Sequence, residues 1–242
     1  MKMVRDTTGR FAQRPHYEPS ELDRECEQIV SNYLRRKHGH VVFPLDTDDL
    51  TALIEQESED LDLYADLSDY GEGVEGVTIF APGGKPSVKI ARELSEATSQ
   101  NRLRTSLSHE FGHVHFHSYL FDTSLRNMDL FANDQASRAG QELGREQVCK
   151  RDSMVNAAQS DWMEWQAGHV CGAMLMPVTV LKDFLQEEFS SQILSAGTSI
   201  DAKMRAEVIN VVASYFLVSK EAATVRLLRL KFLPESSFTP SL

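Results

Sequence analysis

The pattern of hydrophobic and polar positions predicts a chain built mainly of amphipathic helices with a few short strands. Apolar residues recur at helical spacing in several segments, and short apolar runs predict strands. The turn residues Pro82, Gly83 and Gly84 separate the last two strands. The predicted helices cover residues 21–38, 101–117, 161–176, 177–189, 201–218 and 220–230, and the predicted strands cover residues 41–43, 74–81 and 87–91. This mixture predicts an α+β fold.

Three stretches lack a clear period. Residues 1–19 contain a glycine and two prolines among polar residues, and we expect a loose N-terminal tail. Residues 122–158 form a polar insertion with weak helical pieces, and residues 190–199 form a linker rich in serine. We therefore predict a domain over residues 20–190, followed by a helical segment over residues 195–235.

The chain of 242 residues has a formal charge of −11, and one stretch carries most of it. Residues 46–75 contain 12 acidic and no basic side chains, so the remainder sums to +1. A negative chain is a poor general binder of nucleic acid, because neutralising phosphates needs surplus Lys and Arg; a local basic patch could still exist. We expect a solvated helix face followed by a loop, and the alternative is an electrostatic rim that attracts a basic partner.

Cysteine use and hydropathy predict a cytoplasmic protein without a membrane segment. The 3 cysteines form no CxxC pair, which suits a reducing compartment. The N-terminus lacks the apolar stretch of a secretory signal. The most apolar run, Val208–Val218, is interrupted by Asn210 and Ser214 and is too short to span a bilayer.

The clearest chemical signal is an HExxH motif on the predicted helix over residues 101–117. His109 and His113 are four positions apart and so share one helix face, where both ring nitrogens can reach one ion at about 2 Å. Glu110 lies about 100° around the helix axis, beside the ion, where it can move a proton between water and a leaving amine. Two imidazoles and an open position suit a catalytic zinc, with one ion per chain.

Such a site needs a third protein ligand, and the best candidate is Glu164. Its predicted helix looks buried otherwise, and a buried carboxylate needs a cation or a hydrogen-bond donor. The alternative is a half-exposed glutamate at a helix start, where the helix dipole favours it. The spacing alone leaves both interpretations open.

Other polar residues are weaker candidates. His117 continues the stripe of His109 and His113, so it is either a partner that orients a ligand or an ordinary core or surface histidine. His169 follows Glu164 by five positions and is a weak candidate for a similar role or for stabilising an oxyanion. Tyr119 and Tyr70 are further candidates for the hydrogen-bond donor that stabilises the oxyanion.

These residues carry a family resemblance. The run Arg102-Leu-Arg-Thr-Ser-Leu-Ser-His-Glu-Phe-Gly-His-Val-His-Phe-His117 resembles the zinc helix of the ImmA/IrrE family of metallopeptidases. Glu164-Trp-Gln-Ala167, continuing to Leu175-Met-Pro177, resembles that family's second motif, whose glutamate is the third zinc ligand. The tail Phe216-Leu-Val-Ser219 with Arg226-Leu227 resembles its closing segment, so the resemblance covers roughly residues 46–233.

The resemblance implies a cytoplasmic, site-specific zinc endopeptidase whose substrate is a protein, such as a helix-turn-helix transcriptional repressor. It also implies a zincin-like fold, with helices packed on a small antiparallel sheet. In this chain Gly168 stands where the family usually has an asparagine, and that asparagine resembles a group that orients the first zinc histidine in related peptidases. The partner of His109 is therefore unassigned.

Two other classes of function remain open. The helices over residues 201–218 and 220–230, with Ser219 capping the second, have the dimensions of a helix-turn-helix and suit a DNA-binding regulator. A zinc protein that acts by binding a partner, as in a toxin–antitoxin pair, would keep the metal site without strong proteolysis. The substitution Glu110→Gln separates that reading from the peptidase.

Overall fold

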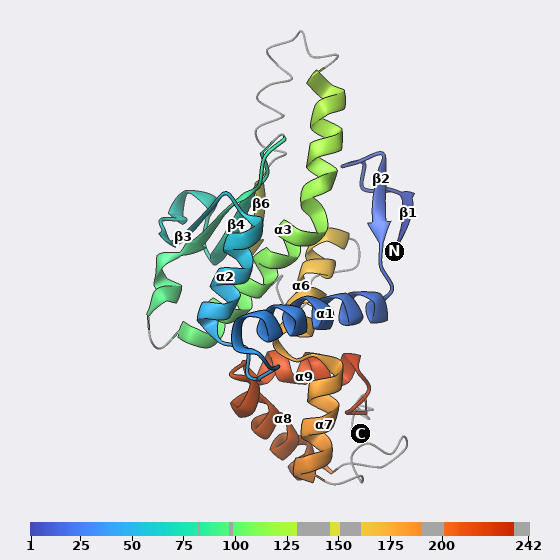
Figure 1. The fold of residues 1–242 in the computed structure, drawn as a ribbon, viewed down its shortest axis with the longest axis vertical. Helices are drawn as coiled ribbons and strands as arrows, with labels where there is room; N and C mark the ends of the chain where they lie inside the picture. The colour runs from blue at the N-terminus through green and yellow to red at the C-terminus, as the bar shows by residue number, and fades with distance from the viewer. Residues whose placement is uncertain (82, 97–98, 130–145, 151–160, 190–200, 235–242) are drawn as a thin grey trace, which may run out of the picture.

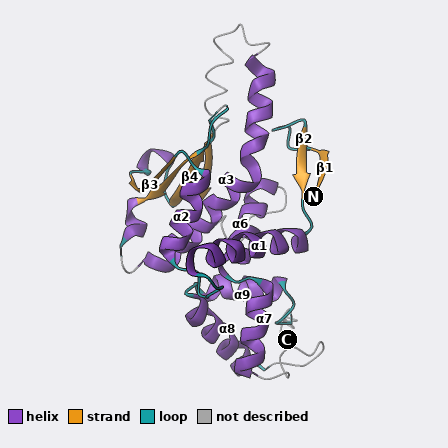
Figure 2. Cartoon of the chain, in the orientation of Figure 1, coloured by secondary structure: helices purple, strands orange, loops and turns teal. Residues whose placement is uncertain are grey.

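The fold is α+β, as predicted, and its elements follow the expected order (Figure 1; Figure 2). The computed structural model describes residues 1–81, 83–96, 99–129, 146–150, 161–189 and 201–234. The helices are α1 (Pro19–His38), α2 (Thr47–Glu57), α3 (Gln100–Asp129), α6 (Trp162–Leu175), α7 (Val178–Phe189), α8 (Ala202–Phe216) and α9 (Lys220–Arg229). The strands are β1 (Lys2–Arg5), β2 (Gln13–His16), β3 (Asp60–Ala65), β4 (Val74–Ile79), β5 (Ser87–Ala91) and β6 (Glu146–Lys150), and short 3-10 helices occur at Ser68–Tyr70 (η1) and Arg92–Ser95 (η2).

The larger sheet has the strand order β3-β5-β4-β6. Strand β4 is antiparallel to both β5 and β6, whereas β3 runs parallel to β5. The prediction of an antiparallel sheet is therefore wrong for one pair. The reason is topological, because the strand that follows α2 was not predicted, and it pairs with β5 rather than with its neighbour in sequence.

Helices α3 and α6 pack against each other at the centre of the molecule (Figure 1). Almost every side chain of α6 is buried, which accounts for the apolar run that predicted this helix. The sheet contacts α3 through β4, α2 packs on α3, and α1 crosses α6. Beyond α1, helices α7, α8 and α9 gather at the end of α6 (Figure 1). The place where α3 and α6 meet is therefore surrounded by other elements, while the C-terminal part of α3 extends beyond them (Figure 1).

The N-terminal residues form a hairpin rather than the expected loose tail. Strands β1 and β2 pair antiparallel, with Lys2 opposite His16 and Arg5 opposite Gln13. Phe11 packs edge-on against Phe121 of α3, with ring centroids 5.2 Å apart. The hairpin lies on the side of α3 away from the larger sheet (Figure 1). This stretch contains few apolar residues, and one of them, Phe11, finds its aromatic partner only in the folded chain. No periodic pattern therefore marked the hairpin, and the prediction was wrong.

Several other expectations need correction. Residues 41–43 are not a strand, and among the described residues they pair with none. Strand β3 occupies part of the acidic stretch where a loop was expected. The predicted insertion over residues 122–158 contains the last turns of α3 and all of β6, and its remaining residues, like the linker over residues 190–199, lie outside the described ones.

The acidic stretch is also less solvated than expected at two positions. Asp49 is buried and accepts a hydrogen bond from Lys37 Nζ at 2.7 Å. Glu75 is buried and accepts from Arg102 Nε at 2.9 Å. Both carboxylates hold structural elements together.

The C-terminal helices match their prediction. Ser219 Oγ accepts a hydrogen bond from the backbone N–H of Ala222 at 3.0 Å, so it caps α9 as expected. Within the described part of the chain, no single helix is long and apolar enough to cross a membrane. Helices α8 and α9 reach that length only together, as a pair bent by 110°.

Candidate metal centre

Two helices bring the predicted metal ligands together. His109 and His113 point from one face of α3, and Glu164 lies in the first turn of α6, whose N-terminal cap is Asp161. Gly112 lets the helices approach closely, because a Cβ there would lie 2.9 Å from Ala167 Cα. The glycine of one motif thus faces the alanine of the other, and this contact holds Glu164 within reach of the histidines.

The three side chains converge on one point. The Nε2 atoms of His109 and His113 are 3.1 Å apart. Glu164 Oε2 lies 3.3 Å from His109 Nε2, and Glu164 Oε1 lies 3.1 Å from His113 Nε2. Ligand atoms about 2.0–2.1 Å from a tetrahedral metal would be separated by about 3.3–3.4 Å. The spacing therefore fits a metal ion held among them.

The site is buried, and its polar atoms are not satisfied by protein groups alone. Both histidine side chains are fully buried, and that of Glu164 is 5% exposed. Among the described residues, His109 Nδ1 and Glu164 Oε2 have no hydrogen-bond partner. Buried polar atoms without partners are rare, so an ion is a natural complement to this set. A partner that would orient the His109 ring through Nδ1 is thus not found among the described residues.

The electrostatics of the site favour a carboxylate opposite a positive charge. Burial alone would raise the pKa of Glu164, but His113 and His109 hold it well below its usual value. Burial would likewise lower the pKa of His109, yet the neighbouring Glu164 holds it above its usual value. A metal ion would supply the positive charge while leaving both rings neutral.

Glu110 lies beside this cluster and turns toward the sheet. Its Oε2 accepts a hydrogen bond from Thr78 Oγ1 of β4 at 2.5 Å, while its Oε1 has no partner among the described residues. Burial raises the pKa of Glu110. A side chain at Gly76 would overlap this carboxylate, so the bare backbone of β4 makes room for it. Glu110 therefore has one oxygen fixed and the other available for proton transfer.

A chain of hydrogen bonds orients His113. Pro15 offers only a carbonyl, so Gln166 Nε2 donates to it at 3.0 Å, and Gln166 Oε1 faces His117. Burial lowers the pKa of His117 to about 3, so this ring is neutral. His117 Nε2 then donates to Gln166 Oε1 at 3.0 Å, and its Nδ1 accepts from His113 Nδ1 at 3.1 Å. The lone pair of His113 is thereby left on Nε2, facing Glu164.

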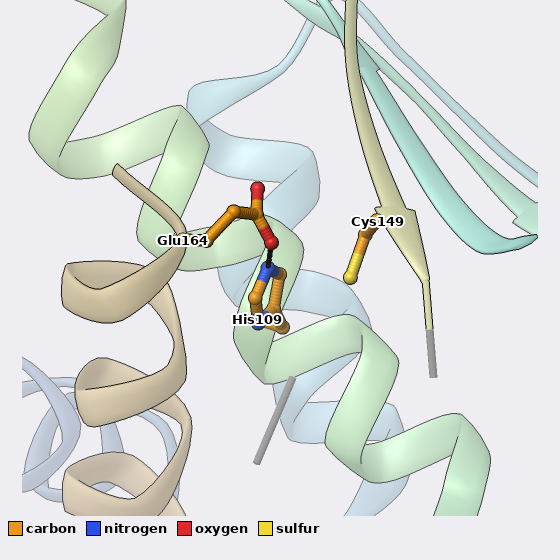
Figure 3. Close-up of side chains that lie close together, drawn as sticks. All are labelled: His109, Cys149 and Glu164. Carbon is orange, nitrogen blue, oxygen red and sulfur yellow. Dashed lines mark ion pairs between the residues drawn. The ribbon is translucent and has the colours of Figure 1, made fainter. Parts of the chain in front are cut away.

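Strand β6 adds two residues that the sequence analysis missed. Gln147 Nε2 donates to Glu164 Oε1 at 2.5 Å. Cys149 Sγ, a ring nitrogen of His109 and a carboxylate oxygen of Glu164 all lie within 4.8 Å of one another (Figure 3). This buried group could hold a metal ion. In the sequence these residues lie in a polar stretch without a clear period, so no local signal marked them.

The weaker candidates fare differently. His117 contacts a predicted ligand directly, as described above. His169 belongs to another cluster, where its Nε2 lies 2.9 Å from Asp23 Oδ1, so its expected role beside the metal is wrong. Tyr119 directs its hydroxyl at Met3 Sδ of the hairpin, 4.0 Å away, and Tyr70 ends the short helix η1.

No model of a protein family matches the chain, and no curated protein matches it. The family resemblance therefore rests on the motifs, and the arrangement of the ligands rests on the structure.

Proposed function

We propose that this protein is a zinc-dependent endopeptidase. The observation that carries the proposal is the convergence of His109 Nε2, His113 Nε2 and the Glu164 carboxylate, at 3.1–3.3 Å from one another, in a fully buried setting. Two imidazoles and a carboxylate are the ligand set of zinc peptidases, and such a set suits zinc better than magnesium or calcium, which prefer oxygen ligands. Glu110, next to His109 on α3, supplies the acid–base group.

The chemistry follows from where each group lies. Zinc bound by these residues supplies a Lewis acid, which makes water more acidic and polarises a peptide carbonyl. Thr78 fixes Oε2 of Glu110, so Oε1 takes the proton from the attacking water and passes it to the leaving amine. The raised pKa of Glu110 suits this exchange, because a group that both takes and gives a proton works best near the ambient pH.

We further propose a protein substrate, with a helix-turn-helix repressor as the leading class, and action in the cytoplasm. The support is the resemblance to the ImmA/IrrE family, whose two zinc motifs correspond to the segments of α3 and α6 that meet here. A reducing compartment is consistent with a cysteine thiol beside the metal position. Membership of that family is part of this proposal.

The test compares the wild-type protein with Glu110→Gln. Each of the two proteins is expressed in its source cell. New N-termini among the proteins of that cell are then identified by chemical labelling and mass spectrometry. We expect cleavage products with the wild type and a loss of about 10²–10⁴-fold with Glu110→Gln, because the metal ligands remain but the proton acceptor is gone. Glu57→Gln, on α2, is the control and should keep the activity. Identical N-termini in all three samples would contradict the proposal and favour a zinc protein that acts by binding.

One observation favours a second candidate, a DNA-binding regulator. Helices α8 and α9 are bent by 110° across a short turn, within the range of helix-turn-helix motifs. However, Arg226 of α9 is buried and bonded to Asp23, which removes a cation from any DNA contact. A gel shift with duplex DNA at several salt concentrations tests this function, and absence of binding near physiological salt would exclude it.

A further inference from the structure

Strand β6 presents Cys149 to the metal position. The side chains of Gln147 and Cys149 share one face of the strand, since they are two positions apart, and both are buried. Gln147 on this face already touches Glu164. Figure 3 shows the sulfur of Cys149 on the side of His109 and Glu164, with the strand behind it.

A local irregularity in the sheet lies at this residue. Val74 is opposite Lys150 and Gly76 is opposite Cys149, so Glu75 is an extra residue on β4. Glu75 is anchored to α3, because it accepts hydrogen bonds from Arg102 and from Ser106. Bulges of this kind re-aim neighbouring side chains and recur beside active sites. The partner residue, Gly76, has no side chain to compete with the thiol for space.

The distances leave the thiol close to, but short of, coordination. With a Zn–S bond of about 2.3 Å and a Zn–N bond of about 2.0 Å, the two ligand atoms would be about 3.5 Å apart. The sulfur lies within 4.8 Å of a ring nitrogen of His109 and of a carboxylate oxygen of Glu164, and His113 is not part of this group, so completing a tetrahedral set needs a shift of the thiol toward all three ligands. Strand β6 is at the edge of the described sheet and pairs with β4 alone there, so such a shift breaks no second ladder.

A second feature of the site also indicates that a fourth ligand can be accommodated. The side chain of Glu164 is 5% exposed, and apart from the contact with His109 Nε2 at 3.3 Å its Oε2 accepts no hydrogen bond among the described residues. This oxygen and the two histidine nitrogens provide three ligand positions. A tetrahedral ion has a fourth, and in a catalytic zinc site that position is held by water or substrate.

We propose that Cys149 is a fourth protein ligand, which closes this open position in the resting protein. This inference rests on the proposed metal site. Coordination replaces the Sγ–H bond by an Sγ–metal bond, and the proton is released to solvent; no electrons are transferred. When Cys149 withdraws, the proton returns to sulfur and the position is open to water or substrate. The protein thus has a closed state and an open state that differ in one ligand.

Cobalt(II) tests this directly, because a cobalt–thiolate bond produces strong charge-transfer absorption in the near ultraviolet. The full-length protein is loaded with Co²⁺ alone, as wild type and as Cys149→Ala, Cys171→Ala and Cys26→Ala. The last two remove the other buried cysteines and serve as matched controls. We expect the band in the wild type and both controls, and its loss in Cys149→Ala. Zinc affinity, from competition with a chelator, should fall at least about tenfold in Cys149→Ala, as it does when even an outer partner is lost.

Azide then tests whether the fourth position is closed. Azide should change the visible cobalt spectrum of Cys149→Ala, where the position is open, and leave that of the wild type unchanged. If cobalt binds but the wild type shows no thiolate band, Cys149 is not a ligand, and the three-ligand peptidase site stands without it. If azide alters the wild-type spectrum as readily, the closing role is overturned. Failure of the wild type to bind cobalt at all would overturn both this inference and the proposed function.

Discussion

Gly112 of α3 lies against Ala167 of α6 so closely that a Cβ on the glycine would be 2.9 Å from the alanine Cα and 3.2 Å from its Cβ. The obstacle is backbone, so it cannot move aside as a flexible side chain can. This contact sets the distance between the helix that carries His109 and His113 and the helix that carries Glu164. The metal centre therefore depends on a residue that offers it no ligand.

Gly112→Ala is predicted to lower both stability and metal affinity. Alanine in a helix interior gains about 0.5–1 kcal/mol over glycine, whereas overpacking costs about 1–3 kcal/mol, so the net effect should be destabilising. Urea unfolding and zinc competition measure the two effects. Gly172→Ala, on α6, is the control, since its Cβ would meet only the side chain of Arg226, at 3.4 Å. Equal stability and affinity in the two variants would contradict the account.

Gln166→Leu should weaken metal binding although Gln166 is not a ligand. It removes the acceptor for His117 and the donor to Pro15, so the tautomer of His113 is no longer fixed. Loss of such an outer partner typically lowers metal affinity by about 10–100-fold. Chelator competition measures the change, with Gln56→Leu, an exposed position on α2, as the control. Unchanged affinity in Gln166→Leu would show that the hydrogen-bond chain does not orient the ligand.

The buried pair of Asp23 and Arg226 predicts a pH-dependent contribution to stability. Burial would raise the pKa of Asp23, but His169 and Arg226 hold it below its usual value of 3.8. A carboxyl group whose pKa is lowered on folding stabilises the protein fully above its unfolded pKa, and this contribution is lost as the pH falls through the folded value. Asp23→Asn should therefore cost about 3 kcal/mol at neutral pH, because it leaves Arg226 buried without its carboxylate.

Urea unfolding at several pH values checks this prediction. The difference between the wild type and Asp23→Asn should be largest near neutral pH and should shrink below about pH 4. Asp69→Asn, at an exposed position, should change little across the same range. A difference that is constant with pH would mean that the charge of Asp23 does not stabilise the fold.

The features that could be predicted from the sequence are those that depend on the local spacing of residues, such as helices and their caps. The spacing of His109 and His113 requires only a helix, and α3 supplies one. The apolar run predicted the helix that carries Glu164. Capping chemistry predicted that Ser219 begins the last helix. For Glu164 as third ligand the sequence alone left two interpretations, and the structure brings its carboxylate to the two imidazoles.

What could not be predicted depends on contacts distant in sequence. Cys149 and Gln147 lie in a polar stretch, and only the pairing of β6 with β4 brings them to the metal position. Strand β3 was missed although its aspartates alternate with leucines, because aspartate is rare in strands and the acidic stretch was interpreted as a loop. The hairpin was missed because Phe11 finds its partner more than a hundred residues away. His169 was misplaced because its partner, Asp23, belongs to a distant helix.

The most direct test of the central claim is the zinc content of the wild-type protein and of Glu164→Gln, purified without added metal and measured by elemental analysis. We predict about one zinc per chain for the wild type, retained on desalting, and a clear loss in Glu164→Gln. Glu187→Gln, on α7, should keep the wild-type content. A wild-type protein that contains no metal and takes up none when zinc is added at neutral pH would contradict the account.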